Sequence, residues 1–244
     1  MHEMGITNRK VIAGFRSLVA DKTQISDDSG WSQRLVYYHL LRYRAKLIKE
    51  KERANLLISR WNYQTIPCIP LDKTHLDECP CVPKDDCTFL KTKIRIPKPI
   101  GKLKSVTSTS GNIIYTYAEW DKLQYRINSR FAGERDSAYY TLKTGPEGTF
   151  LYLYNDIHKK YITVTGIFEN PIEVQFYPGC DGKAVECRNP LDQEWILDPD
   201  LLTSVYDLAL NQLFKGKQMA TDVTNDDIDG ISIQDDNAGN RTKS

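Results

Sequence analysis

The sequence predicts an α+β fold, with helices at both ends of the chain and an antiparallel, β-rich domain between them. Three observations support this class. A helical pattern without Pro or Gly runs from Ser32 to Trp61, short segments of alternating apolar and polar residues fill residues 88–173, and Asp198-Pro199 opens another apolar helical pattern. Helices and strands that are segregated along a chain are typical of α+β proteins.

On this basis we divide the 244 residues into five regions. The regions are a helical region (1–62), an extended arm rich in Cys and Pro (63–87), an antiparallel β-rich domain with an inserted helix (88–194), a C-terminal helix (195–216) and a flexible acidic tail (217–244).

The helical region is predicted to form a hairpin. A first helix runs from Asn8 to about Ala20 with Thr7 as its N-cap. The second runs from Ser32 to Trp61 and would be roughly 45 Å long at about 1.5 Å per residue. Because a small domain is only about 30 Å wide, we expect part of its apolar face to contact another chain.

The candidate subunit-interface residues are the apolar members of this long pattern. They are Val36, Leu40, Tyr43, Leu47, Leu57 and Trp61. Glu50 interrupts the series, so we expect it to reach solvent or to find a basic partner.

Basic residues are concentrated on the long helix, although the net charge of the chain is only +1. The stretch between Trp31 and Trp61 contains eight basic residues and only two acidic ones. Lys91, Lys93 and Arg95 lie on the polar face of a predicted strand. The residues predicted to face DNA or an acidic partner are Arg42, Arg44, Lys46, Lys49, Arg53, Lys91, Lys93 and Arg95. A solvated helix face is an alternative, as is contact with the Asp-rich tail of another copy.

Three closely linked strands are predicted in the β-rich domain, over residues 138–145, 149–155 and 160–168. Because their connections are short, we expect them to be antiparallel. The inserted helix spans Tyr117 to Phe131, with Trp120, Leu123, Ile127 and Phe131 inward. The final helix begins with Asp198 as N-cap and Pro199 at its first position.

Known catalytic motifs are absent from the sequence, so we expect no enzymatic activity and no cofactor. No apolar run has the length of a secretory signal or of a membrane span. The six Cys are therefore expected to be free thiols. Two metal sites remain as alternatives: zinc at Cys68, His75, Cys79, Cys81 and Cys87, whose spacing is irregular, and calcium at Asn225–Gly230, which lacks the usual final Glu.

The order of parts resembles a head-to-tail connector (ring or adaptor) structural protein of tailed bacteriophages, of the crAss-like type. The residues that carry the resemblance are the basic helix, QTIPC at 64–68, LDKTHLDECPC at 71–81, KTKIRIPKPI at 91–100, TFLYLYND at 149–156, GIFENP at 166–171, the helix LDPDLLTSVYDLALNQLF and the tail motif DVTNDDID.

This resemblance implies a non-enzymatic virion protein, assembled in the host cytoplasm and located at the head–tail junction or in the tail. Copies would form a ring, expected to be a dodecamer, that joins the portal to the tail and surrounds the DNA exit channel. The implied partners are other copies, the portal, other tail or connector proteins and packaged DNA, with no membrane. The alternative is a nucleic-acid-binding protein that uses the basic helix.

Overall fold

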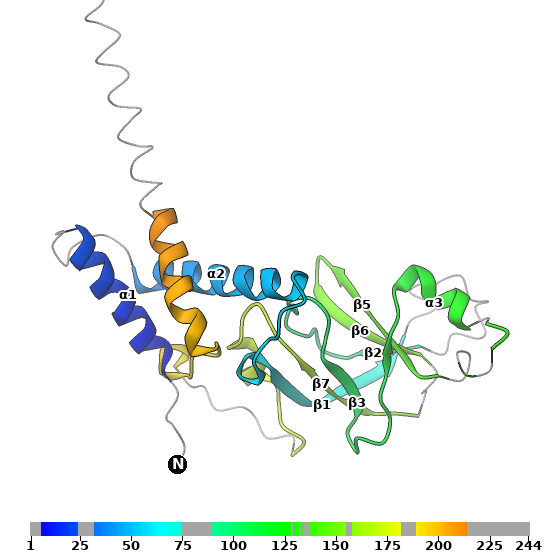
Figure 1. The fold of residues 1–244 in the computed structure, drawn as a ribbon. Coiled ribbons are helices and arrows are strands. Elements are labelled where there is room, and N and C mark those ends of the chain that lie inside the picture. Colours follow the sequence, from blue (N-terminus) through cyan, green and yellow to red (C-terminus); the bar gives the residue numbers. More distant parts are fainter. Residues whose placement is uncertain are drawn as a thin grey trace, which may run out of the picture.

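The computed structural model describes residues 6–23, 32–74, 89–127, 129–131, 133, 137–154, 158–181 and 189–213. Figure 1 shows helices gathered at one end of the molecule, a twisted sheet in the middle and a short helix at the far end. The predicted α+β class is confirmed.

The helical end contains α1 (Asn8–Thr23), α2 (Gln33–Arg53) and a C-terminal helix that covers residues 199–213. These helices share one apolar core (Figure 1). Its buried residues are Val11, Ile12, Phe15, Val19, Val36, Leu40, Tyr43, Ile48, Ile100, Ile167, Trp195, Leu197, Leu201, Val205, Ala209 and Leu210.

Side chains cap the three helices of the helical end, and the predicted N-caps Thr7 and Asp198 are confirmed. Thr7 Oγ1 accepts a hydrogen bond from Lys10 N (3.4 Å) and Ser32 Oγ accepts one from Leu35 N (3.2 Å). Asp198 Oδ1 accepts one from Asp200 N (3.3 Å). Each cap satisfies a backbone N–H group that has no partner within its own helix.

The predicted long helix is shorter than expected, because α2 ends at Arg53. Asn55 adopts the left-handed region with φ 52°. Leu56 N donates to Lys51 O (3.0 Å) and Asn55 N donates to Glu52 O (3.1 Å), which is the hydrogen-bond pattern of a Schellman C-terminus. The helix is therefore about 31 Å long, and length alone no longer requires a second chain. The chain then passes through the 3₁₀ turn η1 (Arg60–Asn62).

Glu50 behaves as expected for the residue that interrupts the apolar series. It is exposed, and its carboxylate lies 3.9 Å from Lys46 Nζ. Ile48 takes the core position nearest to it and is fully buried.

Seven strands form one sheet in the order β3-β7-β1-β2-β6-β5-β4. Their bounds are β1 Gln64–Lys73, β2 Leu90–Thr92, β3 Ser105–Ser108, β4 Thr116–Tyr117, β5 Tyr139–Gly145, β6 Gly148–Tyr154 and β7 Tyr161–Gly166. Neighbouring strands are antiparallel except for β4 and β5, which are parallel.

The segment predicted as an extended arm supplies the central strand β1. Its first part pairs with β7, and its last three residues pair with β2. Pro67 is accommodated because the register shifts between Ile66 and Ile69, where Cys68 has φ 52°. Such a bulge leaves a strand position unpaired, which suits a residue without an N–H group.

The hairpin of β5 and β6 is confirmed, and β7 runs antiparallel to β6 as expected, although the two strands are not neighbours. β7 does not pair with β6, because β1 and β2 lie between them. A short connection between two strands suggests that they are neighbours in the sheet. It does not reveal that strands from earlier in the sequence, here β1 and β2, lie between them.

The far end of the sheet carries α3 (Trp120–Ile127), which is shorter than the predicted helix from Tyr117 to Phe131. Leu123 is buried with Phe89 in a small apolar cluster that is separate from the helical core and from the larger core of the sheet. Phe131, predicted to point inward, lies beyond the helix and is 75% exposed.

A disulfide joins Cys68 of the β1 bulge to Cys180, with the Cα atoms 5.1 Å apart. The expectation of free thiols is therefore wrong for these two residues. They are 112 residues apart, so spacing gives no hint of the pair. The sheet brings them together, because η4 (Glu173–Phe176) lies against β1. The other four Cys lie outside the described residues.

Candidate assembly surface and basic groove

The predicted subunit-interface residues separate into two groups in the structure. Val36, Leu40 and Tyr43 are buried in the chain's own helical core, and Leu47 is partly buried against it. A neighbouring subunit cannot contact the first three, because α1 and the C-terminal helix already cover this face of α2. For these positions the structure corrects the predicted contact with another chain.

Leu57 and Trp61, in contrast, are exposed. Leu57 is 97% and Trp61 is 59% exposed, and Leu56 beside them is 57% exposed. We call these three residues the apolar turn. The Arg60 guanidinium lies 5.6 Å from the centroid of the Trp61 ring, which adds a cation–π contact at this surface.

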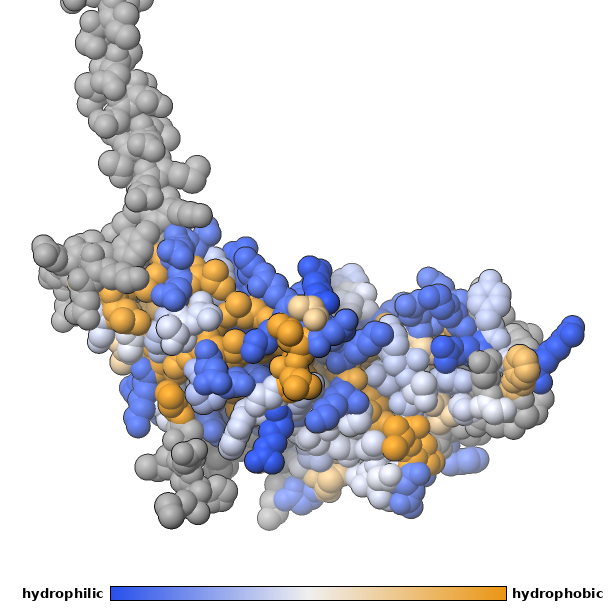
Figure 2. Space-filling view, viewed as in Figure 1, coloured by the Kyte–Doolittle hydropathy of each residue, from blue (hydrophilic) through white to orange (hydrophobic). Residues whose placement is uncertain are grey.

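Hydrophobic residues are also exposed elsewhere on the helical end. Figure 2 shows them gathered over the helices, between charged residues, on the face that is viewed. Leu18 of α1 and Leu35 of α2 are among the exposed large apolar residues. Exposed apolar area of this kind often marks a protein–protein contact.

Arg44 is the clearest departure from the sequence prediction. It was predicted to face DNA or an acidic partner, but it is fully buried. Its Nε donates to Ile196 O (2.6 Å) and its Nη1 donates to Phe168 O (2.9 Å). The guanidinium thus joins α2 to the end of the sheet and to the segment before the C-terminal helix.

The Arg44 site contains no carboxylate partner among the residues described. Burial lowers the pKa of Arg44 to about 10, and the nearby Tyr37 opposes this shift. Burial also raises the pKa of the Tyr37 hydroxyl above its usual range. Arg44 therefore remains charged at neutral pH and serves as a buried cross-link to two carbonyl groups.

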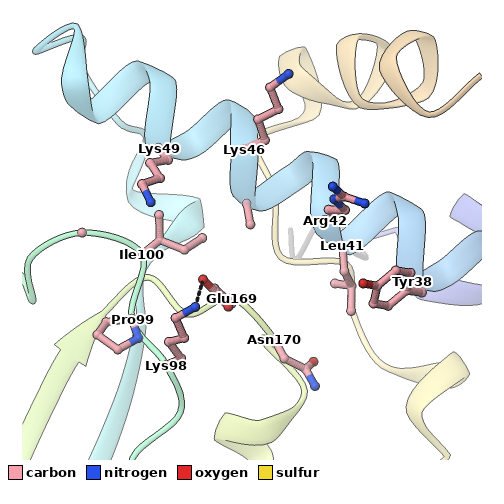
Figure 3. A pocket seen from close by; sticks show the side chains of 12 residues that line it. Tyr38, Leu41, Arg42, Lys46, Lys49, Lys98, Pro99, Ile100, Glu169 and Asn170 are labelled. Carbon is pink, nitrogen blue, oxygen red and sulfur yellow. Dashed lines mark ion pairs between the residues drawn. The ribbon is translucent and has the colours of Figure 1, made fainter. Parts of the chain in front are cut away.

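Three other cations of α2 line a groove of about 580 Å³, which we call the basic groove. Figure 3 shows Arg42, Lys46 and Lys49 on α2 and Lys98 on the facing segment. The spacing of three and four residues places the three α2 cations on neighbouring positions of the helix surface. Sequence reasoning selected these three residues but missed Lys98, because only tertiary packing places it opposite α2.

Backbone hydrogen bonds hold the second wall of the groove. Ile100 N donates to Ile167 O (2.7 Å), and Glu169 N donates to Lys98 O (2.9 Å). The two segments are thereby locked side by side, and the Lys98 ammonium lies 2.9 Å from the Glu169 carboxylate (Figure 3).

Gly101 anchors this wall to the end of α2. Lys102 N donates to Glu52 Oε1 (3.2 Å), and Gly101 has φ +66°. A Cβ atom on Gly101 would lie 1.7 Å from Glu52 Oε2, so a larger residue would displace the carboxylate that fixes the wall.

Apolar side chains line the basic groove between the cations. They are Leu41, Ala45, Pro99 and Ile100. Arg42 and Lys49 form no ion pair with any residue in the described part of the chain. The groove therefore combines an apolar lining with cations that are available to a ligand.

The other predicted cations do not belong to this groove. Arg53 is exposed at the end of α2. Lys91 Nζ lies 4.5 Å from the Phe150 ring centroid, and Lys93 Nζ lies 3.9 Å from Asp72. Arg95 is exposed, and its carbonyl accepts a hydrogen bond from the Tyr177 hydroxyl.

The two metal alternatives receive no support from the described residues, which contain no group of three or more His, Cys, Asp or Glu suited to a metal. Cys68 is in a disulfide and so is not available as a thiolate ligand for zinc. His75, Cys79, Cys81, Cys87 and the Asn225–Gly230 segment lie outside the described residues. Among the helices that the structure describes, none has the length and apolar character of a membrane span.

The chain matches a known protein family over most of its length. The family model CrAss ring 2, described as phage tail ring protein 2, matches residues 17–236. The chain belongs to this family of crAss-like phage tail ring proteins. The match spans the helical end, the sheet and most of the tail, and it confirms the resemblance drawn from the sequence. No curated protein matches the chain.

Proposed function

We propose that this phage tail ring protein is a non-enzymatic subunit of a head-to-tail connector, in which copies form a ring that joins the portal to the tail around the DNA exit channel. The family supports a ring-forming structural protein of the virion. The observation that carries the proposal is the apolar turn, because Leu57, at 97%, is more exposed than any other large apolar residue that the structure describes.

A ring requires contacts in which one face of a subunit meets a different face of the next. We propose that the apolar turn supplies one such face. It lies where α2 leads into the sheet, so a neighbour seated there would contact both parts of the subunit. Trp61 suits this role, since Trp is enriched among residues that dominate binding energy at interfaces.

Electron microscopy of the purified protein tests ring formation, and imaging of the virion tests its position. We expect rotationally symmetric particles, with the ring between portal and tail. Leu57→Ser with Trp61→Ser should abolish rings without unfolding the subunit. A ring that persists unchanged in this double variant would exclude the apolar turn as a contact. Virions in which the protein lies far from the portal would contradict the connector role.

Direct binding of DNA is the second candidate, and the exposed cations Arg42, Lys49 and Arg53 favour it. Affinity for DNA would then fall steeply as salt rises, with a slope that reflects the number of phosphate contacts. Absence of binding at low salt would remove this candidate and leave the ring proposal intact.

A further inference from the structure

We infer that the basic groove binds the acidic segment 222–236 of a second copy of this chain. This inference rests on the proposed ring, because it needs copies that stand next to one another. It assigns the groove a ligand of defined chemistry, an acidic and aliphatic peptide.

The groove offers more positive charge than its own residues neutralise. Lys98 is paired with Glu169 at 2.9 Å, and Lys46 lies 3.9 Å from Glu50 with both groups exposed. Arg42 and Lys49 have no acidic partner among the described residues. A ligand that brings carboxylates to these two cations would therefore gain attraction without breaking an existing ion pair.

The segment 222–236 matches this groove in charge and in apolar character. Its sequence, DVTNDDIDGISIQDD, contains six Asp and no Lys or Arg. It also contains Val223, Ile228, Ile231 and Ile233, which suit the lining formed by Leu41, Ala45, Pro99 and Ile100.

The length of the segment also fits. Fifteen residues reach about 50 Å when extended. The stretch of α2 that lines the groove, Tyr38 to Lys49, spans about 18 Å. The segment can therefore follow the groove along its whole length and leave residues to connect it to its own subunit.

Two features favour this peptide over DNA. The groove has an apolar lining, which phosphates cannot use but the Val and Ile side chains of the segment can. Its volume of about 580 Å³ lies within the roughly 300–1,000 Å³ of sites that enclose small ligands, whereas a duplex requires a broad, open surface.

The position of the C-terminal helix favours a second copy over the chain's own tail. Figure 1 shows this helix crossing α2 and ending on the side of α2 away from the sheet. The groove lies on the side of α2 that faces Lys98 and Glu169 (Figure 3). A neighbour in a ring can bring its segment to this side directly.

Photo-crosslinking in the full chain tests the inference. Tyr38 lines the groove and is exposed, so it is replaced by p-benzoyl-phenylalanine, another aromatic residue. Unlabelled and ¹⁵N-labelled copies are mixed before assembly, and crosslinked peptides are identified by mass spectrometry. We expect crosslinks from position 38 to residues 222–236 that join one labelled and one unlabelled copy. The same probe at Tyr125, which is exposed on α3, is the matched control and should give none.

The second part of the test reverses the charge of two cations that line the groove. Arg42→Glu with Lys49→Glu should lower the crosslink yield about tenfold, because each change turns an attraction for the Asp residues of the segment into a repulsion. Adding Asp226→Lys and Asp229→Lys should restore it. Arg34→Glu with Arg53→Glu changes the same helix and the same net charge outside the groove, and should leave the yield unchanged.

Three results would overturn the inference: crosslinks only within one copy, crosslinks to DNA in place of the segment, or an equal loss in the Arg34 and Arg53 control. Native mass spectrometry of the same sample separates this inference from the proposed function. Rings that form without the crosslink refute the tail contact alone. A third outcome is a protein that stays monomeric but binds a fluorescein-labelled peptide of residues 218–238. If Arg42→Glu with Lys49→Glu weakens this binding, the groove assignment holds and the ring proposal fails.

Discussion

The buried half of the apolar pattern and the exposed apolar turn have the same appearance in the sequence but opposite positions in the structure. Val36, Leu40 and Tyr43 lie in the core of the subunit, whereas Leu57 and Trp61 lie on its surface. The difference arises at Asn55, where the left-handed backbone ends α2. Apolar periodicity therefore identifies residues that need burial or a partner, and the helix end decides which of the two each residue receives.

The largest effect is expected in the buried half. Leu40→Ala should lower the free energy of unfolding by about 2–5 kcal/mol, because it leaves a cavity among α1, α2 and the C-terminal helix. Urea denaturation followed by circular dichroism measures the change. A loss below about 1 kcal/mol would show that the helical core is not packed as described here.

Arg44 tests whether the helical end and the sheet are joined through buried hydrogen bonds. Arg44→Met keeps much of the side-chain volume but leaves Phe168 O and Ile196 O without their donors. We expect a loss of about 2–4 kcal/mol in the free energy of unfolding. Arg42→Met, on the exposed side of α2, is the control and should change stability by less than about 0.5 kcal/mol. Equal stability of the two variants would contradict the cross-link.

Substitutions at Asn55 test whether its left-handed backbone ends α2 and so divides the buried part of the apolar pattern from the exposed apolar turn. Asn55→Val places a β-branched residue in the left-handed region and should cost about 1–2 kcal/mol, whereas Asn55→Gly should leave stability nearly unchanged or raise it slightly. Thermal unfolding of the two variants gives the comparison. A harmless Val would indicate that α2 continues toward Trp61, as the sequence alone suggests.

The smallest effect on folding is expected in the apolar turn. Leu57→Ser should change the free energy of unfolding by less than about 0.5 kcal/mol, because the side chain is almost fully exposed. Under the proposed function the same change should weaken ring formation, which analytical ultracentrifugation can follow across a concentration series. Leu18→Ser, on the exposed face of α1, is a matched control for loss of surface apolar area. If both variants assemble normally, the ring contact lies elsewhere.

Local signals in the sequence were sufficient where the structure depends on neighbouring residues. The caps at Thr7, Ser32 and Asp198 and the β5–β6 hairpin follow from such signals. The Schellman end of α2 also has a local signal that the sequence analysis missed, because Asn55 is of a residue type that can adopt φ > 0. The cations Arg42, Lys46 and Lys49 were predicted only as part of a larger set that also contained the buried Arg44 and the exposed Arg53.

By itself the sequence determined the α+β class, the starts of the first and last helices and the family, because each depends on local spacing or on an extended run of residues. Only the tertiary structure decided that Arg44 is buried, that β1 enters between β7 and β2, that Cys68 meets Cys180 and that Lys98 faces α2. These facts join residues far apart in the chain, and their energies come from burial and hydrogen bonds that no local pattern contains.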